Sequence, residues 1–584
     1  MSKKSFTAMF GGQAGYGVMS AGSTVAKAAS RYGLWAIVVN EYPSLIKGGL
    51  NDCLVQIGSV PQDAYDEELD FLGAFSQPAW DQNINKLKPG AVALYDDGAV
   101  KPDLVKLPEG VQVFPVKLVQ SLESGDEKVM VNSAMLAAFC ALTGFSSETI
   151  LHVFASEFTK ADVLEKNMSL FHKVFTAVQD EYKVSKQFPF AFEKTDRKKM
   201  LINGNDAISL GALAAGVTFA AGYPMTPGSS VLTYLADHGD AYGLVFKQAE
   251  DEIAAMNMLI GAGFGGVRAI GATSGGGFAL MVEALGFAAQ AEIPVVMVLA
   301  QRGGPSTGLP TRTAQADLNF VYYSSQGEFP RLIVAPGDVD ECFYETFRVF
   351  NLAEKYQMPA IILTDKYLAD SSWVQDFFDQ SGLAIERSLA DEDYLASHQP
   401  YLRYSLTENG VSPRSFPGQK GGRHIATSYT HGADGFYSSG NREYAAEEPS
   451  ITEKGTDKLF NKVEDLLKEI PSVKLHGPEM ADLTVIGWGS SKGAILAAMD
   501  EVAQQGVSVN YLQVLYPSPF PTAAVEAVLQ KAKKTLLIEG NKTGQLGLLL
   551  GSYTGIKPDF TYFKYDSRPF SVKAIADKIK EVLV

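Results

Sequence analysis

The fold of this chain is decided by a stretch that begins Gly222-Tyr-Pro-Met-Thr-Pro-Gly-Ser-Ser230 and ends at Arg312. Between these ends lie two further motifs, Glu250-Asp-Glu252 and Thr273-Ser-Gly-Gly-Gly277, and the stretch closes with Gly308-Leu-Pro-Thr-Arg-Thr313. Apolar segments of strand or helix length separate the four motifs. The pattern predicts an α/β domain whose loops carry the functional residues, although Gly and Pro also punctuate ordinary turns.

The apolar segments predict a parallel sheet. Residues 295–300 are rich in Val, which is typical of a strand buried on both faces of such a sheet. The small residues of 205–220 predict a helix, and 253–263 and 278–290 predict two more. Open α/β sheets bind ligands beyond the carboxyl ends of their strands, so the motifs are expected to gather there.

Three residue types in these loops suit chemistry on a carbonyl acid. Thr226 stands between two prolines, which fix the turn and could hold its hydroxyl against a substrate carbonyl or carboxylate. A glutamate at the start of a helix, Glu252 or Glu250, could handle a proton, but acids there also stabilise the helix dipole. Arg312 could clamp a carboxylate through its guanidinium or form a structural ion pair.

A second glycine-rich turn lies near the start of the chain, in Gly11-Gly-Gln-Ala-Gly-Tyr-Gly17. A strand over 6–10, a helix over 18–31 and a strand over 34–40 are predicted around it. Backbone N–H groups at Gly12 and Gly15 could approach an anion at the helix N-terminus. The spacing is not that of a dinucleotide fingerprint, and Lys47-Gly-Gly49 is either a further anion contact or a solvated turn.

Length and charge restrict the class of protein. A chain of 584 residues needs several domains, and 46% hydrophobic with 20% charged residues is ordinary for a soluble globular protein. The formal net charge of −16 argues against nucleic acid and against an anionic membrane surface.

The three cysteines, Cys53, Cys140 and Cys342, are far apart and have no CxxC spacing. They favour a reducing cytoplasm and are too few to hold an iron–sulfur cluster. We expect no metal site in this chain, no signal peptide and no membrane span.

The motifs resemble those of 2-oxoacid:ferredoxin oxidoreductases. Tyr223-Pro-Met-Thr-Pro227, Thr273-Ser-Gly275 and Gly308-Leu-Pro-Thr-Arg-Thr-Ala-Gln-Ala-Asp-Leu318 are similar to the alpha subunit, and the turn at Gly11 is similar to the gamma subunit. Trp488-Gly-Ser-Ser and Glu539-x-Asn-x-x-Gly-Gln-Leu resemble the C-terminal module of transketolases.

The resemblance implies an α/β chain of three domains joined by a long segment. A Rossmann-like gamma domain is expected over 1–185 and a pyrimidine-type, thiamine-diphosphate-binding parallel-sheet domain over 195–385. An irregular connecting segment would follow over 386–475, and a transketolase C-like domain over 476–584.

The resemblance also assigns roles to residues. Glu252 would activate the aminopyrimidine of thiamine diphosphate, with Glu250 as the second choice, and Thr226 and Arg312 would contact the substrate. The remaining cofactor-binding candidates are Tyr223, Pro224, Ser274, Gly275, Lys47, Gly12 and Gly15. Of these, Lys47 and the first glycines would serve coenzyme A or a contact between domains. His431 matches a histidine region of the family, and a structural role for it stays open.

The implied reaction converts a 2-oxoacid and coenzyme A to acyl-CoA and CO₂, with two electrons passing to ferredoxin, in one direction or in both. The sequence has no Gly-Asp-Gly followed by Asn-Asn to hold Mg²⁺ and diphosphate. A beta subunit is therefore expected to supply Mg²⁺, the diphosphate site and a 4Fe–4S cluster, in a heterodimer or a dimer of heterodimers. The thiamine diphosphate would be shared between the two chains.

Several alternatives remain open at this stage. The fusion of gamma and alpha parts favours 2-oxoglutarate, with succinyl-CoA as product, but pyruvate or a branched-chain 2-oxoacid would keep every motif. An NAD-dependent dehydrogenase built on the first domain and a non-catalytic scaffold subunit are the rivals from other classes.

Overall fold

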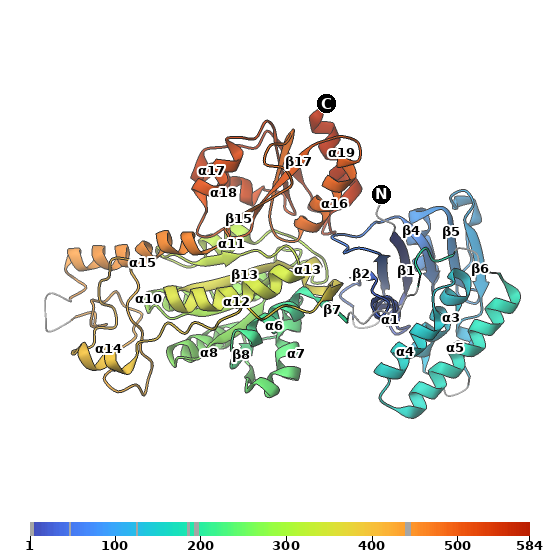
Figure 1. Cartoon of the computed structure of the whole chain (residues 1–584). Helices are drawn as coiled ribbons and strands as arrows, with labels where there is room; N and C mark the ends of the chain where they lie inside the picture. Colours follow the sequence, from blue (N-terminus) through green and yellow to red (C-terminus); the bar gives the residue numbers. More distant parts are fainter. Residues whose placement is uncertain (1–4, 46–47, 124–126, 184–186, 192–197, 439–444) are drawn as a thin grey trace. The chain divides into compact units, whose positions relative to one another are not determined.

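The computed structural model describes residues 5–45, 48–123, 127–183, 187–191, 198–438 and 445–584. The chain forms two compact units (Figure 1). The first contains residues 1–203 and 370–378, and the second contains 204–369 and 379–584. Within the described residues, no helix has both the length and the apolar character that crossing a membrane requires.

The first unit is built on an eight-stranded mixed sheet with the order β6-β5-β4-β1-β3-β2-β14-β7. Its strands are β1 (Ser5–Gln13), β2 (Trp35–Glu41), β3 (Leu50–Gly58), β4 (Leu69–Ala74), β5 (Leu87–Asp96), β6 (Gln112–Val116), β7 (Lys199–Asn203) and β14 (Ser372–Asp376). Its helices are α1 (Val18–Ser30), α2 (Gln77–Asn83), α3 (Val131–Thr143), α4 (Ser147–Glu157) and α5 (Ala161–Glu181). Four short 3₁₀ turns complete it: η1 (Ile84–Lys86), η2 (Leu104–Lys106), η3 (Val119–Ser121) and η4 (Lys128–Met130).

The predicted strand, helix and strand at the start of the chain are confirmed as β1, α1 and β2. Both strands run antiparallel to β3, which lies between them, so they are parallel to each other. Strand β1 is longer than expected and continues through Gly12 to Gln13, paired with β3 throughout. Strands β7 and β14 extend this sheet, although both come from later in the sequence than residue 185. The domain boundaries inferred from the sequence stay a prediction.

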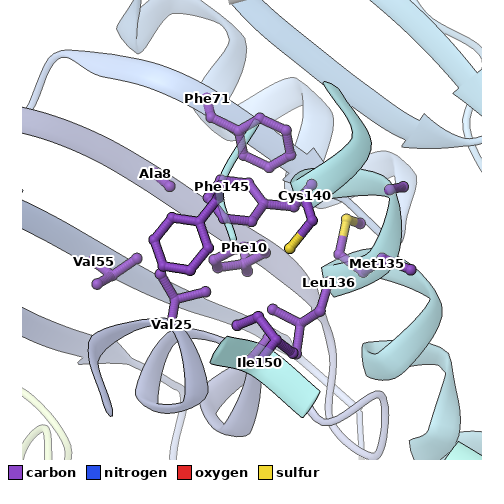
Figure 2. Packing of buried hydrophobic residues seen from close by; sticks show 14 of the residues in the cluster. Ala8, Phe10, Val25, Val55, Phe71, Met135, Leu136, Cys140, Phe145 and Ile150 are labelled. Carbon is purple, nitrogen blue, oxygen red and sulfur yellow. The ribbon is translucent and has the colours of Figure 1, made fainter. Parts of the chain in front are cut away.

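Aliphatic and aromatic side chains pack together in the core of the first unit (Figure 2). Phe139 lies at its centre, with ring centroids 4.9 Å from Phe71 and 5.4 Å from Phe145. Cys53 and Cys140 are buried with free thiols, and burial raises the pKa of Cys53 to about 12. Both behave as small apolar core residues.

The second unit contains a six-stranded sheet, β12-β13-β11-β10-β8-β9, in which every neighbouring pair is parallel. Its strands are β8 (Phe219–Gly222), β9 (Val245–Gln248), β10 (Ala269–Thr273), β11 (Val295–Gln301), β12 (Leu332–Val334) and β13 (Pro359–Asp365). Its helices are α6 (Gly204–Ala214), α7 (Ser229–His238), α8 (Glu252–Phe264), α9 (Gly275–Phe278), α10 (Val282–Gln290), α11 (Leu318–Tyr323), α12 (Val339–Tyr356) and α13 (Lys366–Asp370), with the 3₁₀ turn η5 (Gly239–Tyr242).

The predicted parallel sheet is therefore confirmed, with two local corrections. The helix expected over 205–220 ends at Ala214, because Gly216 has a φ of 78° and the chain then turns into β8. The helix expected over 278–290 begins only at Val282, as α10, and the separate short helix α9 ends at Phe278.

A second sheet in this unit, β15-β17-β16-β18-β19, is built from the C-terminal residues. Its elements are β15 (Val473–His476), β16 (Leu483–Gly487), α16 (Ser491–Ala503), β17 (Val509–Val514), α17 (Thr522–Leu529), β18 (Thr535–Glu539), α18 (Gln545–Thr554), β19 (Phe560–Phe563) and α19 (Val572–Leu583). We call residues 473–584 the C-terminal module. One hydrophobic core includes Met297 of β11 together with Trp488 and Leu537 of this module. The α/β fold class is confirmed.

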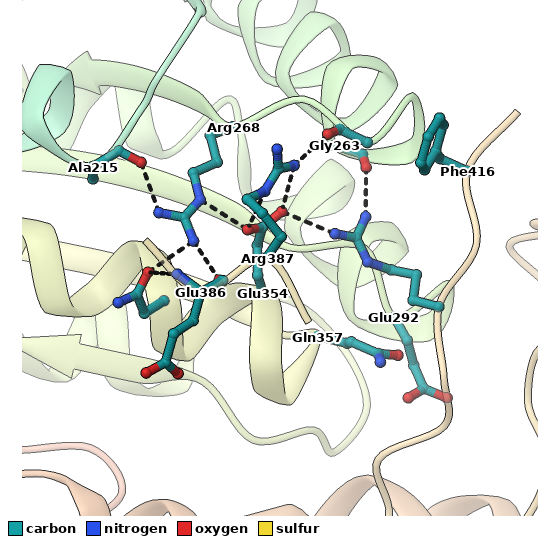
Figure 3. Close-up of polar contacts among 12 residues, drawn as sticks. Ala215, Gly263, Arg268, Glu292, Glu354, Gln357, Glu386, Arg387 and Phe416 are labelled. Atoms are coloured by element: carbon teal, nitrogen blue, oxygen red, sulfur yellow. Dashed lines mark hydrogen bonds and ion pairs between the residues drawn. The ribbon is translucent and has the colours of Figure 1, made fainter. Parts of the chain in front are cut away.

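The segment between the two sheets has more regular structure than its sequence suggested. It contains α14 (Glu392–Ser397) and α15 (Pro449–Glu469). Near its start, three guanidinium groups meet on the buried carboxylate of Glu354 in α12 (Figure 3). They belong to Arg268, Arg387 and Arg414, so this cluster fastens the segment to the parallel sheet.

Candidate active site

The four loop motifs lie at one edge of the parallel sheet. The motifs that begin at Gly222, Glu250 and Ser274 follow β8, β9 and β10, and the arginine loop follows β11. Because all these strands are parallel, their carboxyl ends meet at the same edge, as the sequence predicted.

The acidic triplet at this edge has three separate environments. Asp251 is the N-cap of α8, and its carboxylate accepts from Ala254 N at 2.7 Å. Glu250 is exposed, whereas Glu252, in the first turn of the helix, is only 3% exposed. The capping role belongs to Asp251, so Glu252 is left to face the interior.

Glu252 ends among polar atoms that have no partner. Its Oε1 is buried without a hydrogen bond, and so are Thr273 Oγ1 and Ser274 Oγ at the end of β10. A Cβ added to Gly277 would lie 2.1 Å from Thr273 Oγ1 and 2.5 Å from Glu252 Oε1, so the glycine turn closes directly over these two atoms. Buried polar atoms are rarely left unpaired, and a polar ligand would explain the cluster.

A cavity of about 470 Å³ opens beside this cluster. Ser274 and Gly275 line it from the glycine turn, and Met225 lines it from the turn after β8. Its charged lining residues are Arg302 and Asp317, both from the loop after β11. The volume is within the range typical of small-molecule sites.

The two charged lining residues act on each other. Burial raises the pKa of the Asp317 carboxyl to about 6, and the Arg302 guanidinium opposes this shift. Arg302 donates from Nη1 to Thr226 O at 2.7 Å, which ties the loop after β11 to the turn after β8. Neither Arg302 nor Asp317 is among the site residues predicted from the sequence. The position of Arg302, immediately after a buried parallel strand, was the signal available for it.

A hydrogen bond from helix α6 holds the turn that carries Thr226. Asn205 in α6 donates from Nδ2 to Pro227 O at 2.8 Å. Tyr223 and Pro224 are exposed, and Thr226 is half-buried. Met225 lines the cavity, whereas Thr226 is not one of the lining residues, so its predicted contact with substrate stays a prediction.

Arg312 lies further along the loop after β11. It is half-buried, and its backbone closes the loop through Gly303 N to Arg312 O at 3.0 Å and Arg312 N to Leu309 O at 3.0 Å. Arg312 is not one of the residues that line the 470 Å³ cavity. Its predicted contact with substrate stays a prediction.

The remaining candidates belong to the first unit. Gly12 lies inside β1, where an added Cβ would come 2.8 Å from Phe75, so packing already explains this glycine. Gly15 has a φ of 95° and open space around it, and Gly17, at the N-cap of α1, has a φ of 69°. Lys47 is outside the described residues.

His431 lies in a different place within the second unit. It lines a separate cavity of about 330 Å³ together with Glu292, which comes just before β11 and hence at the opposite edge of the sheet. Burial lowers the pKa of the His431 imidazole. Both ring nitrogens lie 3.1 Å from backbone carbonyls, of Gly432 and Gln290, as expected for a structural histidine.

Three family models match the chain. They are "Pyruvate ferredoxin/flavodoxin oxidoreductase" over 7–177, "Pyruvate flavodoxin/ferredoxin oxidoreductase, thiamine diP-bdg" over 210–448 and "Pyruvate:ferredoxin oxidoreductase core domain II" over 481–555. The 2-oxoacid:ferredoxin oxidoreductase subunit alpha of Saccharolobus solfataricus is 30% identical, over 98% of this chain and 97% of the relative. This chain belongs to the 2-oxoacid:ferredoxin oxidoreductase alpha-subunit family.

Two further relatives bear on the kind of 2-oxoacid. The 2-oxoglutarate synthase subunit KorA of Methanothermobacter thermautotrophicus is 34% identical, over 59% of this chain and 88% of the relative. The 2-oxoglutarate:ferredoxin oxidoreductase of Magnetococcus marinus, solved with 2-oxoglutarate, coenzyme A and succinyl-CoA bound, is 33% identical. It matches 100% of both chains with a TM-score of 0.92. The family is one of oxidoreductases, as the sequence predicted.

Proposed function

We propose that this chain is the alpha subunit of a 2-oxoglutarate:ferredoxin oxidoreductase. The reaction converts 2-oxoglutarate and coenzyme A to succinyl-CoA and CO₂, and two electrons reduce ferredoxin. The substrate is supported by the names of the KorA relatives and of the Magnetococcus marinus enzyme. An α-carboxylate and a second carboxylate would require two cationic contacts, and the loop after β11 contains both Arg302 and Arg312.

The observation that carries the proposal is the buried, unpaired Oε1 of Glu252. With Thr273 Oγ1 and Ser274 Oγ it forms a polar surface that fits the aminopyrimidine end of thiamine diphosphate, which has ring nitrogens and an amino group to pair with it. When bound, this cofactor supplies the carbon nucleophile and the electron sink for decarboxylation.

The residues of this chain would position the cofactor and the substrate and would exclude water. Glu252, which is only 3% exposed, would hold a shared proton against the pyrimidine ring of the cofactor. Thr273 and Ser274 would orient this ring, and Gly277 leaves the space that a side chain would fill. Arg302 and Asp317 provide the charged wall of the cavity that receives the substrate. The diphosphate, Mg²⁺ and the 4Fe–4S cluster are assigned to a beta subunit.

Replacing Glu252 tests the role proposed for its buried carboxylate. In the assembled complex, Glu252→Gln should lower kcat by about 10²- to 10⁴-fold, the usual loss when a positioned acid–base group is removed. Ferredoxin-coupled turnover of 2-oxoglutarate is the measurement. The matched control is Glu250→Gln, two residues away and exposed, which should keep wild-type turnover. Equal activity of the two variants would contradict the role given to Glu252.

Comparing substrates tests the reaction. The chain should be purified with its co-expressed partner, and ferredoxin reduction measured with 2-oxoglutarate, pyruvate and a branched-chain 2-oxoacid. We expect the highest kcat/KM for 2-oxoglutarate, dependence on coenzyme A and thiamine diphosphate, and no turnover by the isolated chain. A preference for pyruvate would overturn the substrate, and full activity of the isolated chain would overturn the need for a beta subunit.

A further inference from the structure

The C-terminal module forms hydrogen bonds with the loop after β11 through Gln315. Every polar group of this residue is bonded to the module. Its N donates to Gly540 O at 2.9 Å, and its O accepts from Asn541 Nδ2 at 3.0 Å. Its Oε1 accepts from Gly540 N at 2.8 Å, and its Nε2 donates to Trp488 O at 2.9 Å. The side chain is only 3% exposed, so these bonds are shielded from water.

A second glutamine, Gln545 at the start of α18, brackets Asp317. Its Nε2 donates to Ala316 O at 2.7 Å, and its Oε1 accepts from Asn319 N at 2.9 Å. Between these two contacts, Asp317 N donates to Gln301 Oε1 at 2.9 Å. The side-chain amide of Gln545, in the C-terminal module, therefore fixes the backbone before and after Asp317, at Ala316 and Asn319. Gln301 of β11 fixes the N–H of Asp317 itself.

The Asp317 side chain faces the cavity rather than its own helix. Asp317 is the N-cap of α11, a position where Asp usually bonds to the helix, yet its side chain makes no capping bond. The carboxylate lines the 470 Å³ cavity instead, and a Cβ added to Gly275 would lie 2.5 Å from Asp317 Oδ2. Since α11 has only six residues, its own hydrogen bonds are too few to set this orientation.

Inside the module, Glu539 holds in place the residues that bond to the loop after β11. Its carboxylate, completely buried, accepts from Asn541 Nδ2, Trp488 Nε1, Leu546 N and Gly547 N at 2.9 to 3.2 Å. The pattern Glu539-x-Asn-x-x-Gly-Gln545 thus has a physical role. The glutamate fixes the turn, and the turn presents Asn541 and Gln545 to the loop after β11.

We propose that Gln545 is a positioning residue for the reaction: by holding the backbone on both sides of Asp317, it fixes the Asp317 carboxylate in the substrate cavity. The C-terminal module then forms part of the frame of the active site, rather than only an interface. This inference rests on the proposed function, because it takes the cavity to be the substrate site.

The test compares two buried glutamines of the same module in the assembled complex. Gln545→Ala removes the hydrogen bonds to Ala316 O and Asn319 N that hold the backbone around Asp317. Gln513→Ala is the matched control, because Gln513 is also a buried glutamine of the module and donates to Glu341 of α12 at 2.7 Å, away from the loop. Each change removes a buried amide that joins the module to the parallel-sheet part of the unit.

We expect Gln545→Ala to lower kcat/KM for 2-oxoglutarate by about 10- to 100-fold, the size of effect that a misplaced active-site group produces. Its pH profile should shift on the acidic side, since the environment of the Asp317 carboxyl changes. Gln513→Ala should lower the melting temperature by a similar amount and keep the wild-type kcat/KM and pH profile. Gln545→Glu, which keeps the acceptor for Asn319 N and is of equal size, should recover part of the activity.

Two results would overturn the inference: an unchanged kcat/KM in both Gln545 variants, or an equal loss in Gln513→Ala. The Gln545→Glu variant keeps the test decisive if Gln545→Ala fails to fold. Failure of the proposed function is a separate result, because the wild-type complex would then not reduce ferredoxin with 2-oxoglutarate.

Discussion

Asp317 is a residue whose ionisation should cost stability. Burial raises its pKa to about 6 in the folded chain, against about 3.9 in an unfolded one. The unfolded chain releases this proton first, so the contribution of Asp317 to stability is fully present below about pH 4 and is lost as the pH rises through about 6. A native protein that keeps such a residue at neutral pH is typical of a functional site.

Asp317→Asn should therefore stabilise the second unit at pH 7.5, by on the order of 2 kcal/mol, and by less at pH 5. Denaturant unfolding of the purified chain at the two pH values measures the difference. The control is Asp393→Asn, which changes an exposed acid in the first turn of α14 and should have the same small effect at both pH values. A gain that is equal at pH 5 and pH 7.5 would contradict the assignment, because it would not arise from ionisation.

At the scale of elements, the start of α8 contains both the residue that caps the helix and the glutamate assigned to the site. Asp251 caps the helix, and Glu252 follows it directly, so the cap fixes the backbone from which Glu252 projects. In the sequence, only the resemblance to the family ranked Glu252 ahead of Glu250. The extended backbone of Asp251 at the N-cap separates their roles, because it turns one carboxylate to the helix and buries the next.

Asp251→Ala should lower the free energy of unfolding by about 1 kcal/mol, the usual cost of losing an N-cap. It should also reduce turnover, since Glu252 loses its fixed position. Asp251→Ser, which retains a capping oxygen, should restore both. Asp391→Ala removes an equivalent cap, which accepts from Tyr394 N at 2.7 Å in α14, and should affect stability alone. If both alanine variants kept full turnover, the cap would have no part in positioning Glu252.

At the scale of the whole molecule, buried charge holds the long connecting segment in place. Arg268, Arg387 and Arg414 bond to Glu354 at 2.8 to 3.0 Å. The excess positive charge is offset by backbone carbonyls at helix ends, because Arg268 also donates to Ala215 O and Arg414 to Gly263 O. Removing the Glu354 carboxylate would leave the buried guanidinium groups of Arg268 and Arg414 without their ion-pair partner, beside the more exposed Arg387.

Glu354→Gln should therefore destabilise the second unit by about 3 to 5 kcal/mol, the range for breaking a buried ion pair. Hydrogen exchange should rise first in residues 383–416, which the cluster fastens. Glu479→Gln breaks the exposed pair with Lys531, which solvent screens, and should leave the free energy of unfolding nearly unchanged. Uniform exchange across the unit, or equal costs for the two variants, would show that the cluster does not fasten the segment.

The sequence by itself determined the parallel sheet, the edge at which the loops gather and the family. These features depend on strand and helix periodicity and on short motifs, which are local properties of the chain. It also predicted Glu252 within a group of three acids. It did not place β14 in the sheet of the first unit, because that pairing joins Ser372 to Val38, residues far apart in the chain.

Only the tertiary structure decided which polar groups share the cavity. Arg302 and Asp317 became visible there because the burial and direction of a side chain depend on what packs against it, not on its own sequence neighbours. The same holds for Gln545, whose contacts with Ala316 and Asn319 join segments more than two hundred residues apart. Sequence periodicity fixes the local backbone, and long-range packing selects which of its side chains face the site.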